Sequence, residues 1–239
     1  MSDPIIARAT NPTQYDLDDV AWESTAGLEF PIRSFIWSYI KQFTSAWSGK
    51  KIIDIGTGSG WLLKEASKVG ASKLMGIEPS KKNFDSAKNL HPKIEILHVN
   101  LQNVSLGYEF DVALSVLSLS HIDDLVLAFE KISTLLNSDG ELIMVVPDFE
   151  YYKTPRFDYK IVVSEIDENS YAISLTSAYG TLADIVRKTA VYTEEAKKHY
   201  MEHIETIPMK PTADLLAKMP RFQPFANQPI FNLLRFRKQ

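Results

Sequence analysis

The sequence predicts an α/β protein built around a mostly parallel β-sheet. Between residues 51 and 147, short and nearly continuous apolar segments alternate with segments of helical period. Strands that read as unbroken apolar runs are typical of a parallel sheet covered by helices on both faces. A glycine-rich turn, Gly56 to Gly60, follows the first of these strands. Because ligands of such sheets bind beyond the carboxyl ends of the strands, this turn indicates where a site lies.

The size and composition of the chain exclude several kinds of protein. It has 239 residues, of which 45% are hydrophobic and 23% charged, enough for one globular core with a cap. A formal net charge of −4 disfavours binding of nucleic acid through an overall excess of positive charge. The absence of cysteine excludes disulfides, thiolate zinc sites and a cysteine nucleophile. No apolar run reaches membrane-spanning length and the N-terminus has no signal-peptide pattern, so we expect a cytoplasmic protein.

Each element of the core follows from its local pattern. An amphipathic helix is predicted to begin at Pro31 and end at Trp47, because a proline suits the first helical turn and apolar residues follow at helical spacing. Gly70 closes the next helix. Strands are predicted over 51–55, 73–77, 94–99, 110–116 and 141–146, helices over 61–69, 80–90 and 123–136, and a turn over 137–140.

The pattern changes after Pro147. Two segments with strand patterning surround a polar turn and predict a β-hairpin, and the residues that follow predict one or two more strands. The final third reads as a helix, a proline-rich loop and a last strand. The ranges are 158–165 and 170–178 for the hairpin, 180–191 for further strands, 193–204 for the helix, 209–228 for the loop and 230–236 for the last strand.

The glycine loop has the spacing of a site for a ligand without a pyrophosphate. Gly56, Gly58 and Gly60 form a GxGxG pattern rather than the GxGxxG of dinucleotide-binding loops. Trp61 stands where that fingerprint has its last glycine, and its bulk would oppose a pyrophosphate. Glu78 ends the next strand, where a carboxylate can accept hydrogen bonds from ribose hydroxyls.

In these features the sequence resembles the class I S-adenosylmethionine-dependent methyltransferases, strongly over 31–147 and more weakly at the last strand. The loop from Asp54 to Gly60 matches the family's E/D-x-G-x-G-x-G motif, and Glu78 matches its ribose-binding acid. The resemblance implies a Rossmann-like, seven-stranded and mostly parallel sheet with an N-terminal helical lid and a β-rich insertion after the fifth strand. It also implies S-adenosylmethionine as cofactor and S-adenosylhomocysteine as product.

The same resemblance implies the remaining cofactor contacts. Asn100 stands where the family usually has Asp and would meet the adenine amino group, with one charge-assisted bond lost. Leu135 to Pro147 is similar to the family's L-x-P-G-G-x-L-x-x-x-x-P segment, with Ser138 and Asp139 in place of Pro-Gly. The expected cofactor-binding residues are Asp54, Gly56, Thr57, Gly58, Gly60, Glu78, Pro79, Asn100, Leu101, Gln102, Ser115, Tyr15 and Arg33.

The resemblance divides a single methyltransferase domain over 1–239 into four parts. These are a helical cap over 1–47, a cofactor-binding core over 48–147, a substrate-covering insertion over 148–192, and a C-terminal helix and last strand over 193–239.

Catalysis of methyl transfer needs alignment of nucleophile and methyl group, and in some reactions a base. After the fourth strand the sequence reads Ser115-Val-Leu-Ser118, which is not the Asn/Asp-Pro-Pro-aromatic motif of amino-methylating nucleic-acid enzymes and offers no good magnesium ligands. We therefore expect metal-independent methylation of an O, N or C nucleophile on a small molecule. His121 is the candidate base because it follows this strand and titrates near neutrality. The alternative is that it caps the helix beginning near Asp123.

Residues outside the core are expected to contact the amino-acid end of the cofactor and the methyl acceptor. Tyr15 and Arg33 are expected at the amino-acid end of the cofactor, where Arg33 would pair with the carboxylate; the alternative is a packed helix with Arg33 in solvent. Aromatic residues of the insertion predict a pocket for a planar or apolar acceptor, or else ordinary sheet packing. The candidate substrate contacts are Trp22, Leu117, Ser118, Tyr151, Tyr152 and Tyr179.

Three other functions stay open at this point. A nicotinamide or flavin oxidoreductase is opposed by Trp61 and the missing glycine. A methyltransferase-like binding protein without catalysis is kept open by Asn100 and the lack of an obvious base. A protein or RNA methylase is disfavoured by the acidic balance. The expected partner is a small-molecule acceptor, with no membrane or nucleic acid, for a monomer or homodimer.

Overall fold

The computed structural model describes residues 3–17, 27–107, 109–156, 158–177 and 180–239. Its centre is a seven-stranded sheet of strand order β3-β2-β1-β4-β5-β10-β9. The strands are β1 (Lys51–Ile55), β2 (Lys73–Ile77), β3 (Glu95–Leu97), β4 (Phe110–Val116), β5 (Leu136–Pro147), β9 (Met201–Met209) and β10 (Phe231–Lys238). Strands β1 to β5 pair in parallel, and β10 is antiparallel to both of its neighbours. The predicted seven-stranded, mostly parallel sheet is confirmed.

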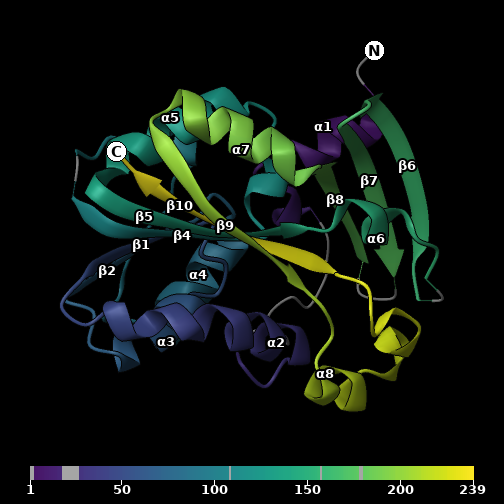
Figure 1. Cartoon of the computed structure of the whole chain (residues 1–239), viewed down its shortest axis with the longest axis horizontal. Helices are drawn as coiled ribbons and strands as arrows, with labels where there is room; N and C mark the ends of the chain where they lie inside the picture. The colour runs from purple at the N-terminus through teal and green to yellow at the C-terminus, as the bar shows by residue number, and fades with distance from the viewer. Residues whose placement is uncertain (1–2, 18–26, 108, 157, 178–179) are drawn as a thin grey trace.

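Helices cover both faces of this sheet (Figure 1). Helices α2 (Pro31–Ile40) and α3 (Trp61–Lys68) lie on one face, and α5 (Leu125–Leu135) and α7 (Thr189–Lys198) lie on the other. The remaining helices are α1 (Pro4–Ala9), α4 (Lys81–Leu90), α6 (Phe149–Lys153) and α8 (Ala213–Lys218), with 3-10 turns η1 (Gln14–Asp16), η3 (Lys41–Ala46), η4 (Leu101–Asn103), η5 (Leu119–His121) and η6 (Pro220–Phe225).

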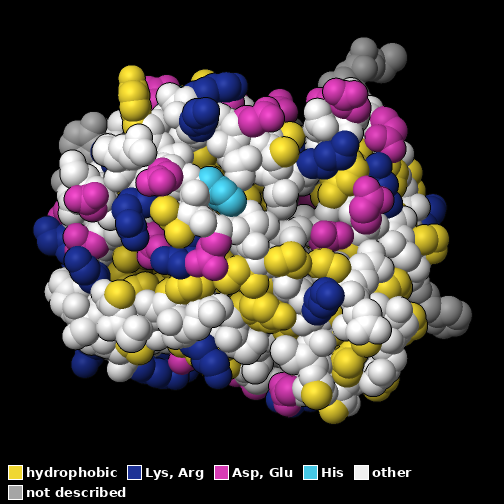
Figure 2. All heavy atoms as spheres, in the orientation of Figure 1, with side chains coloured by type: hydrophobic (Ala, Val, Ile, Leu, Met, Phe, Trp, Pro, Cys, Tyr) yellow, Lys and Arg dark blue, Asp and Glu magenta, His cyan; other side chains and the backbone are white. Residues whose placement is uncertain are grey.

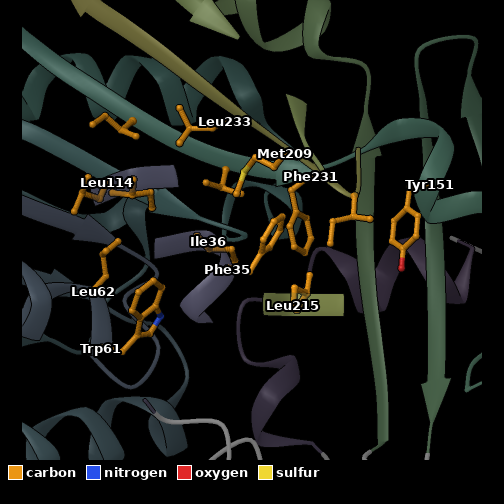
Figure 3. Close-up of a cluster of buried hydrophobic side chains, with 14 of the residues drawn as sticks. Phe35, Ile36, Trp61, Leu62, Leu114, Tyr151, Met209, Leu215, Phe231 and Leu233 are labelled. Atoms are coloured by element: carbon orange, nitrogen blue, oxygen red, sulfur yellow. The ribbon is translucent and has the colours of Figure 1, made fainter. Parts of the chain in front are cut away.

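Two hydrophobic clusters fill the space between the sheet and its helices. Successive side chains of a strand point to opposite faces, so Ile52 joins the cluster under α2 and α3 while Ile53 joins the one under α5 and α7. Figure 3 shows part of the first cluster, in which Phe35 of α2 and Phe231 of β10 lie together. The second includes Phe129 of α5, whose ring meets an aromatic ring of β10.

A second sheet of three antiparallel strands follows β5 and forms the β-rich insertion that the sequence predicts. It consists of β6 (Lys160–Asp167), β7 (Ser170–Ser177) and β8 (Gly180–Arg187). Helix α1 packs against β7 and β8 (Figure 1), and Arg8 donates a hydrogen bond to the carbonyl oxygen of Thr181 at 2.8 Å. The insertion therefore holds the N-terminal segment.

The predicted helix over 193–204 is wrong in its bounds. Helix α7 begins at Thr189 and ends at Lys198, and residues 201–209 form strand β9. Tyr200 adopts a positive φ of 59°, which breaks the helix, and β9 then pairs with β10 along its length. His199 and His203 consequently lie on different elements and do not share a helix face.

Smaller differences concern a predicted turn, a predicted loop and one further helix. The predicted loop over 209–228 contains helix α8 and turn η6. The predicted turn over 137–140 lies within β5 as an irregularity, because Phe110 pairs with Leu136 and Val112 already pairs with Glu141. Helix α6 is an element that the sequence did not predict. Asp148 caps it by accepting hydrogen bonds from the backbone N–H groups of its first turn.

Charged side chains of both signs share the face shown in Figure 2, where Lys and Arg are interspersed with Asp and Glu. This agrees with the net charge of −4. Among the helices that the structure describes, none combines the length and the apolar character that crossing a bilayer requires.

We expect Ile53→Ala to lower the free energy of unfolding by roughly 2–5 kcal/mol, because this fully buried side chain lies between two neighbouring strands and its loss leaves a cavity. Urea denaturation measures the change. Val126→Ala, at a position on α5 with 54% exposure, is the control and should change it by less than about 0.5 kcal/mol. Equal losses in the two variants would contradict the assigned core.

Candidate active site

A cavity of about 360 Å³ lies at the carboxyl ends of the parallel strands. Strand β1 lies between β2 and β4. The chain continues from β1 to β2 and β3 on one side and then crosses to β4 on the other, so the cavity lies at the switch point of the sheet. Its walls come from the glycine loop, the ends of β2 and β4, the N-terminal segment and strand β8. The predicted site residues that line it are Tyr15, Arg33, Gly56, Thr57, Gly58, Glu78, Pro79, Asn100, Leu101, Gln102, Leu117, Ser118, His121 and Tyr152.

The glycine loop needs glycine for two different reasons. Gly56 has a φ of 69°, and a Cβ there would lie 2.5 Å from the Cβ of Ser118, closer than atoms can pack. Gly58 has a φ of 57°, and a Cβ there would meet no heavy atom of the described residues within 4 Å. Because Gly58 lines the cavity, the space beside it is available to a ligand.

Asp54 supports the loop from behind instead of lining the cavity. Its carboxylate is 2% exposed and accepts a hydrogen bond from the Thr57 hydroxyl at 2.8 Å. Burial raises the pKa of Asp54 to about 7; the hydrogen bond from Thr57 opposes this rise, and the negative charge of Glu78 adds to it. The buried Ser115 plays a similar part, since its hydroxyl lies 2.7 Å from that of Ser118.

Glu78 connects the glycine loop to the end of β2. One carboxylate oxygen accepts the backbone N–H of Gly58 at 2.8 Å and the other accepts that of Ser80 at 2.9 Å. Burial raises the pKa of Glu78, while these hydrogen bonds act in the opposite direction. The Asn83 side chain donates a further hydrogen bond, and since a carboxylate offers about four acceptor sites, one remains for a ligand in the cavity.

Asn100 presents an unsatisfied acceptor to the same cavity. Its side-chain oxygen is buried and has no hydrogen-bond partner within the described part of the chain. A buried acceptor without a donor is costly, so the native site is completed by a ligand that brings an N–H or O–H group.

His121 also lines the cavity and lies at the centre of a hydrogen-bonded group. Its Nε2 is 2.8 Å from the Tyr15 hydroxyl, and its Nδ1 is 3.0 Å from the amide nitrogen of Gln14 and 3.4 Å from a carboxylate oxygen of Asp184. The alternative that His121 caps the next helix is wrong, because Asp124 accepts the backbone N–H of Leu127 and caps α5.

Gln14 and Asp184 are site residues that the sequence reasoning missed. Both are buried, and they come from η1 and from β8. Gln14 pairs with the backbone of Ala183 twice, as acceptor from its N–H and donor to its carbonyl, each at 3.1 Å. The one available signal was a single acid, Asp184, within the apolar run of its strand.

Arg33 reaches the cavity from α2, so the alternative that places it in solvent is wrong. Its guanidinium donates to the Ser59 hydroxyl at 3.0 Å and lies 6.0 Å from the centre of the Trp61 ring. Burial lowers the pKa of Arg33 to about 10, which leaves it cationic at neutral pH. The charge therefore lies beside the glycine loop, at the end of the cavity where a ligand carboxylate is expected.

Several predicted residues are not brought to the cavity. Tyr151 packs instead against Phe225 and the guanidinium of Arg156. Gly60 begins α3 and faces His91. Trp22 and Tyr179 lie outside the described residues. Within the described ranges, no three His, Asp or Glu side chains gather as metal ligands.

Comparison with known proteins agrees with this geometry. Residues 53–144 match the family model described as a methyltransferase domain. The chain is 29% identical over 133 residues to the ribosomal protein L11 methyltransferase of Lactobacillus acidophilus, covering 54% of this chain and 39% of that protein. It is 31% identical over 120 residues to the tRNA U34 carboxymethyltransferase of Campylobacter hominis, covering 46% of this chain and 42% of that protein. The matches thus span about two fifths of these relatives.

A solved structure shows the same fold over most of the chain. The S-adenosylmethionine-dependent methyltransferase of Mesorhizobium loti superposes with a TM-score of 0.68 at 20% identity, over 85% of this chain and 98% of that one. Residues 53–144 thus match a methyltransferase-domain model, within a fold shared with a solved S-adenosylmethionine-dependent methyltransferase.

The residues present fit the cofactor of this class. The unsatisfied oxygen of Asn100 suits an adenine amino group, Glu78 suits ribose hydroxyls, and the open space beside Gly58 admits a ligand close to the backbone. S-adenosylmethionine carries no phosphate, so the bulk of Trp61 next to the loop is no obstacle.

We expect the stability of Asp54→Asn, relative to the wild type, to rise with pH. The folded protein keeps Asp54 protonated up to about pH 7, whereas the unfolded chain releases this proton near pH 4, so the wild-type free energy of unfolding falls across that window. The relative gain of the variant reaches up to about 4 kcal/mol. Urea denaturation from pH 4 to pH 7.5 measures it, with the exposed Asp214→Asn as control. A pH-independent difference would contradict the raised pKa.

Proposed function

We propose that the protein is an S-adenosylmethionine-dependent methyltransferase that methylates a small molecule. The observation that carries the proposal is a single cavity with two walls of different chemistry. One wall holds the glycine loop with Glu78 and Asn100, and the other holds His121 and Asp184. A methyl donor and an acceptor in this cavity would face each other, which is the alignment that an in-line displacement needs.

The small-molecule class is favoured by how deeply the acceptor wall is buried. The side chains of His121 and Asp184 are 12% and 4% exposed, beneath the N-terminal segment and β8. Relatives are named for a ribosomal protein and for a tRNA, but their matches cover less than half of their own length. The mixed charges in Figure 2 and the net charge of −4 also disfavour a nucleic-acid acceptor. We propose a cytoplasmic monomer or homodimer.

The cofactor would be held by groups already in place. When bound, S-adenosylmethionine supplies a methyl group attached to a positively charged sulfur. Glu78 would accept the ribose hydroxyls, Asn100 would accept the adenine amino group beside Leu101 and Gln102, and Arg33 would pair with the carboxylate at the far end.

His121 is the proposed proton acceptor, and its neighbours define how it acts. The two bonds between Gln14 and Ala183 fix the Gln14 amide, so its remaining N–H is directed toward Nδ1 of His121 at 3.0 Å, with the carbonyl oxygen of Ala9 at 3.4 Å as a second acceptor. The neutral imidazole therefore carries its proton on Nε2, facing the Tyr15 hydroxyl, and has its lone pair on Nδ1. A proton taken up at Nδ1 would lie beside Asp184, whose negative charge would stabilise the imidazolium.

The cofactor assignment is tested by Gly58→Arg, with Gly49→Arg as a matched control. Both glycines have a positive φ and open space at the Cβ position, so backbone strain is similar, but only Gly58 lines the cavity. We expect Gly58→Arg to weaken binding of S-adenosylhomocysteine by about 100-fold or more, equivalent to ~2.7 kcal/mol. Calorimetric titration measures it. Wild-type affinity in Gly58→Arg would refute the loop as the cofactor site.

Replacing His121 with Asn should slow methyl transfer by about 10²–10⁴-fold while S-adenosylhomocysteine still binds, because general-base catalysis contributes rate accelerations of this size. The assay uses radiolabelled S-adenosylmethionine and the best acceptor from a small-molecule screen. His203→Asn, at an exposed position of β9, is the control. A His121→Asn rate equal to that of the control would exclude His121 as the base.

A further inference from the structure

The acid on strand β8 lacks a permanent counter-ion. Asp184 is 3% exposed and lines the cavity. Within the described part of the chain, the one basic group within 4.0 Å of its carboxylate is His121. A buried carboxylate is strongly disfavoured unless a positive charge or several hydrogen bonds compensate it.

The Gln14 amide opposes a positive charge on His121. Gln14 donates an N–H to Nδ1 of His121 at 3.0 Å, and that nitrogen can accept it only while it is unprotonated. The Gln14 amide cannot turn over, because exchanging its oxygen and nitrogen would set N–H against N–H at Ala183. This contact favours an unprotonated Nδ1, and the carbonyl oxygen of Ala9, 3.4 Å from the same Gln14 nitrogen, can accept the N–H when Nδ1 takes up a proton.

Arginines near the site are engaged elsewhere, and one of them, Arg156, donates to the carbonyl oxygen of Tyr152 at 3.3 Å. Arg187, on β8, donates to the carbonyl oxygens of Leu119, Ile122 and Asp123 and so holds the turn that carries His121. Arg33 donates to Ser59 beside the glycine loop. None of these guanidinium groups lies within 4.0 Å of the Asp184 carboxylate. A cationic occupant of the cavity can supply the compensating charge.

Two tyrosines add to the preference for a cation at this place. Tyr15 and Tyr152 both line the cavity, and both have a raised pKa, through burial first and then through the negative charge of Asp184. Both phenols therefore stay neutral and lie near this carboxylate. A carboxylate beside aromatic rings is a typical environment for an organic ammonium group.

We propose that the methyl acceptor is a primary or secondary amine, which enters as an ammonium ion and is held by Asp184 next to Tyr15 and Tyr152. This inference rests on the proposed methyltransferase function. The ammonium gives one proton by way of Asp184 to Nδ1 of His121. The nitrogen lone pair then forms the new N–CH3 bond while the S–CH3 bond breaks, leaving its electron pair on sulfur. The methylated amine departs as a cation, and His121 later releases its proton to water.

The test uses protein saturated with S-adenosylhomocysteine and three probes of one carbon skeleton: benzylamine, benzyl alcohol and benzoate. A second series has the 2-phenylethyl skeleton. We expect each amine to bind at least about tenfold more tightly than its alcohol, and the carboxylates to bind most weakly. Calorimetric titration gives the affinities, and this wild-type comparison stands without any variant.

Asp184→Asn should remove the preference for amines while leaving S-adenosylhomocysteine affinity unchanged. Asp123→Asn is the matched control, because Asp123 is a second acid that lines the cavity but is exposed. It should keep the preference. The proposal is overturned if alcohols bind as tightly as amines, if Asp184→Asn retains the preference, or if none of the six probes binds.

A further comparison separates an amine site from a site for the cofactor's own sulfonium charge. If Asp184→Asn weakens binding of S-adenosylmethionine relative to S-adenosylhomocysteine and leaves the amine preference intact, the carboxylate serves the sulfonium and the proposal fails. Failure of the wild type to bind S-adenosylhomocysteine would instead refute the proposed function, and the amine assignment with it.

Discussion

The pairing of Gln14 with the backbone of Ala183 holds the candidate site together. It attaches the N-terminal segment to strand β8 through a donor and an acceptor on one buried amide. The next residue, Tyr15, then meets His121, and Asp16 accepts hydrogen bonds from Ser80 and Lys82 at the start of α4. Three consecutive side chains thus connect the insertion, the turn after β4 and the cofactor wall, so the cavity depends on this short segment.

Three buried acids in and around the cavity differ in how their surroundings compensate a negative charge. Burial raises the pKa of Asp54 to about 7, and this acid supports the glycine loop. Glu78 receives two backbone hydrogen bonds and one from Asn83, and offers its remaining acceptor site to a ligand. Asp184 receives no such hydrogen bonds, and within the described part of the chain the one basic group within 4.0 Å of its carboxylate is His121, whose Nδ1 also lies 3.0 Å from the Gln14 amide nitrogen. The difference in compensation separates a structural acid, a cofactor acid and an acid suited to a charged acceptor.

The methyltransferase core and the acceptor wall have different origins in the chain. The core over 53–144 matches a family model and supplies the strands and the glycine loop. The wall proposed for the acceptor comes from residues 10–15, from β8 and from the turn after β4. The relatives include a ribosomal protein methyltransferase and a tRNA carboxymethyltransferase, each matched over about half of this chain, so the likeness by itself does not fix the acceptor.

The sequence by itself determined the parallel sheet, the glycine loop and the places of Glu78 and Asn100, because each depends on local periodicity or on a residue at the carboxyl end of a strand. The sequence also indicated His121 as the candidate base, but it did not indicate the residues that lie within bonding distance of its imidazole. Only the tertiary structure decided that Gln14 and Asp184, 170 residues apart in sequence, meet at one imidazole. It likewise decided that residues 201–209 form a strand, since β9 is stabilised by pairing with β10. Such contacts arise from packing between distant segments, which leaves no periodic signal in either segment alone.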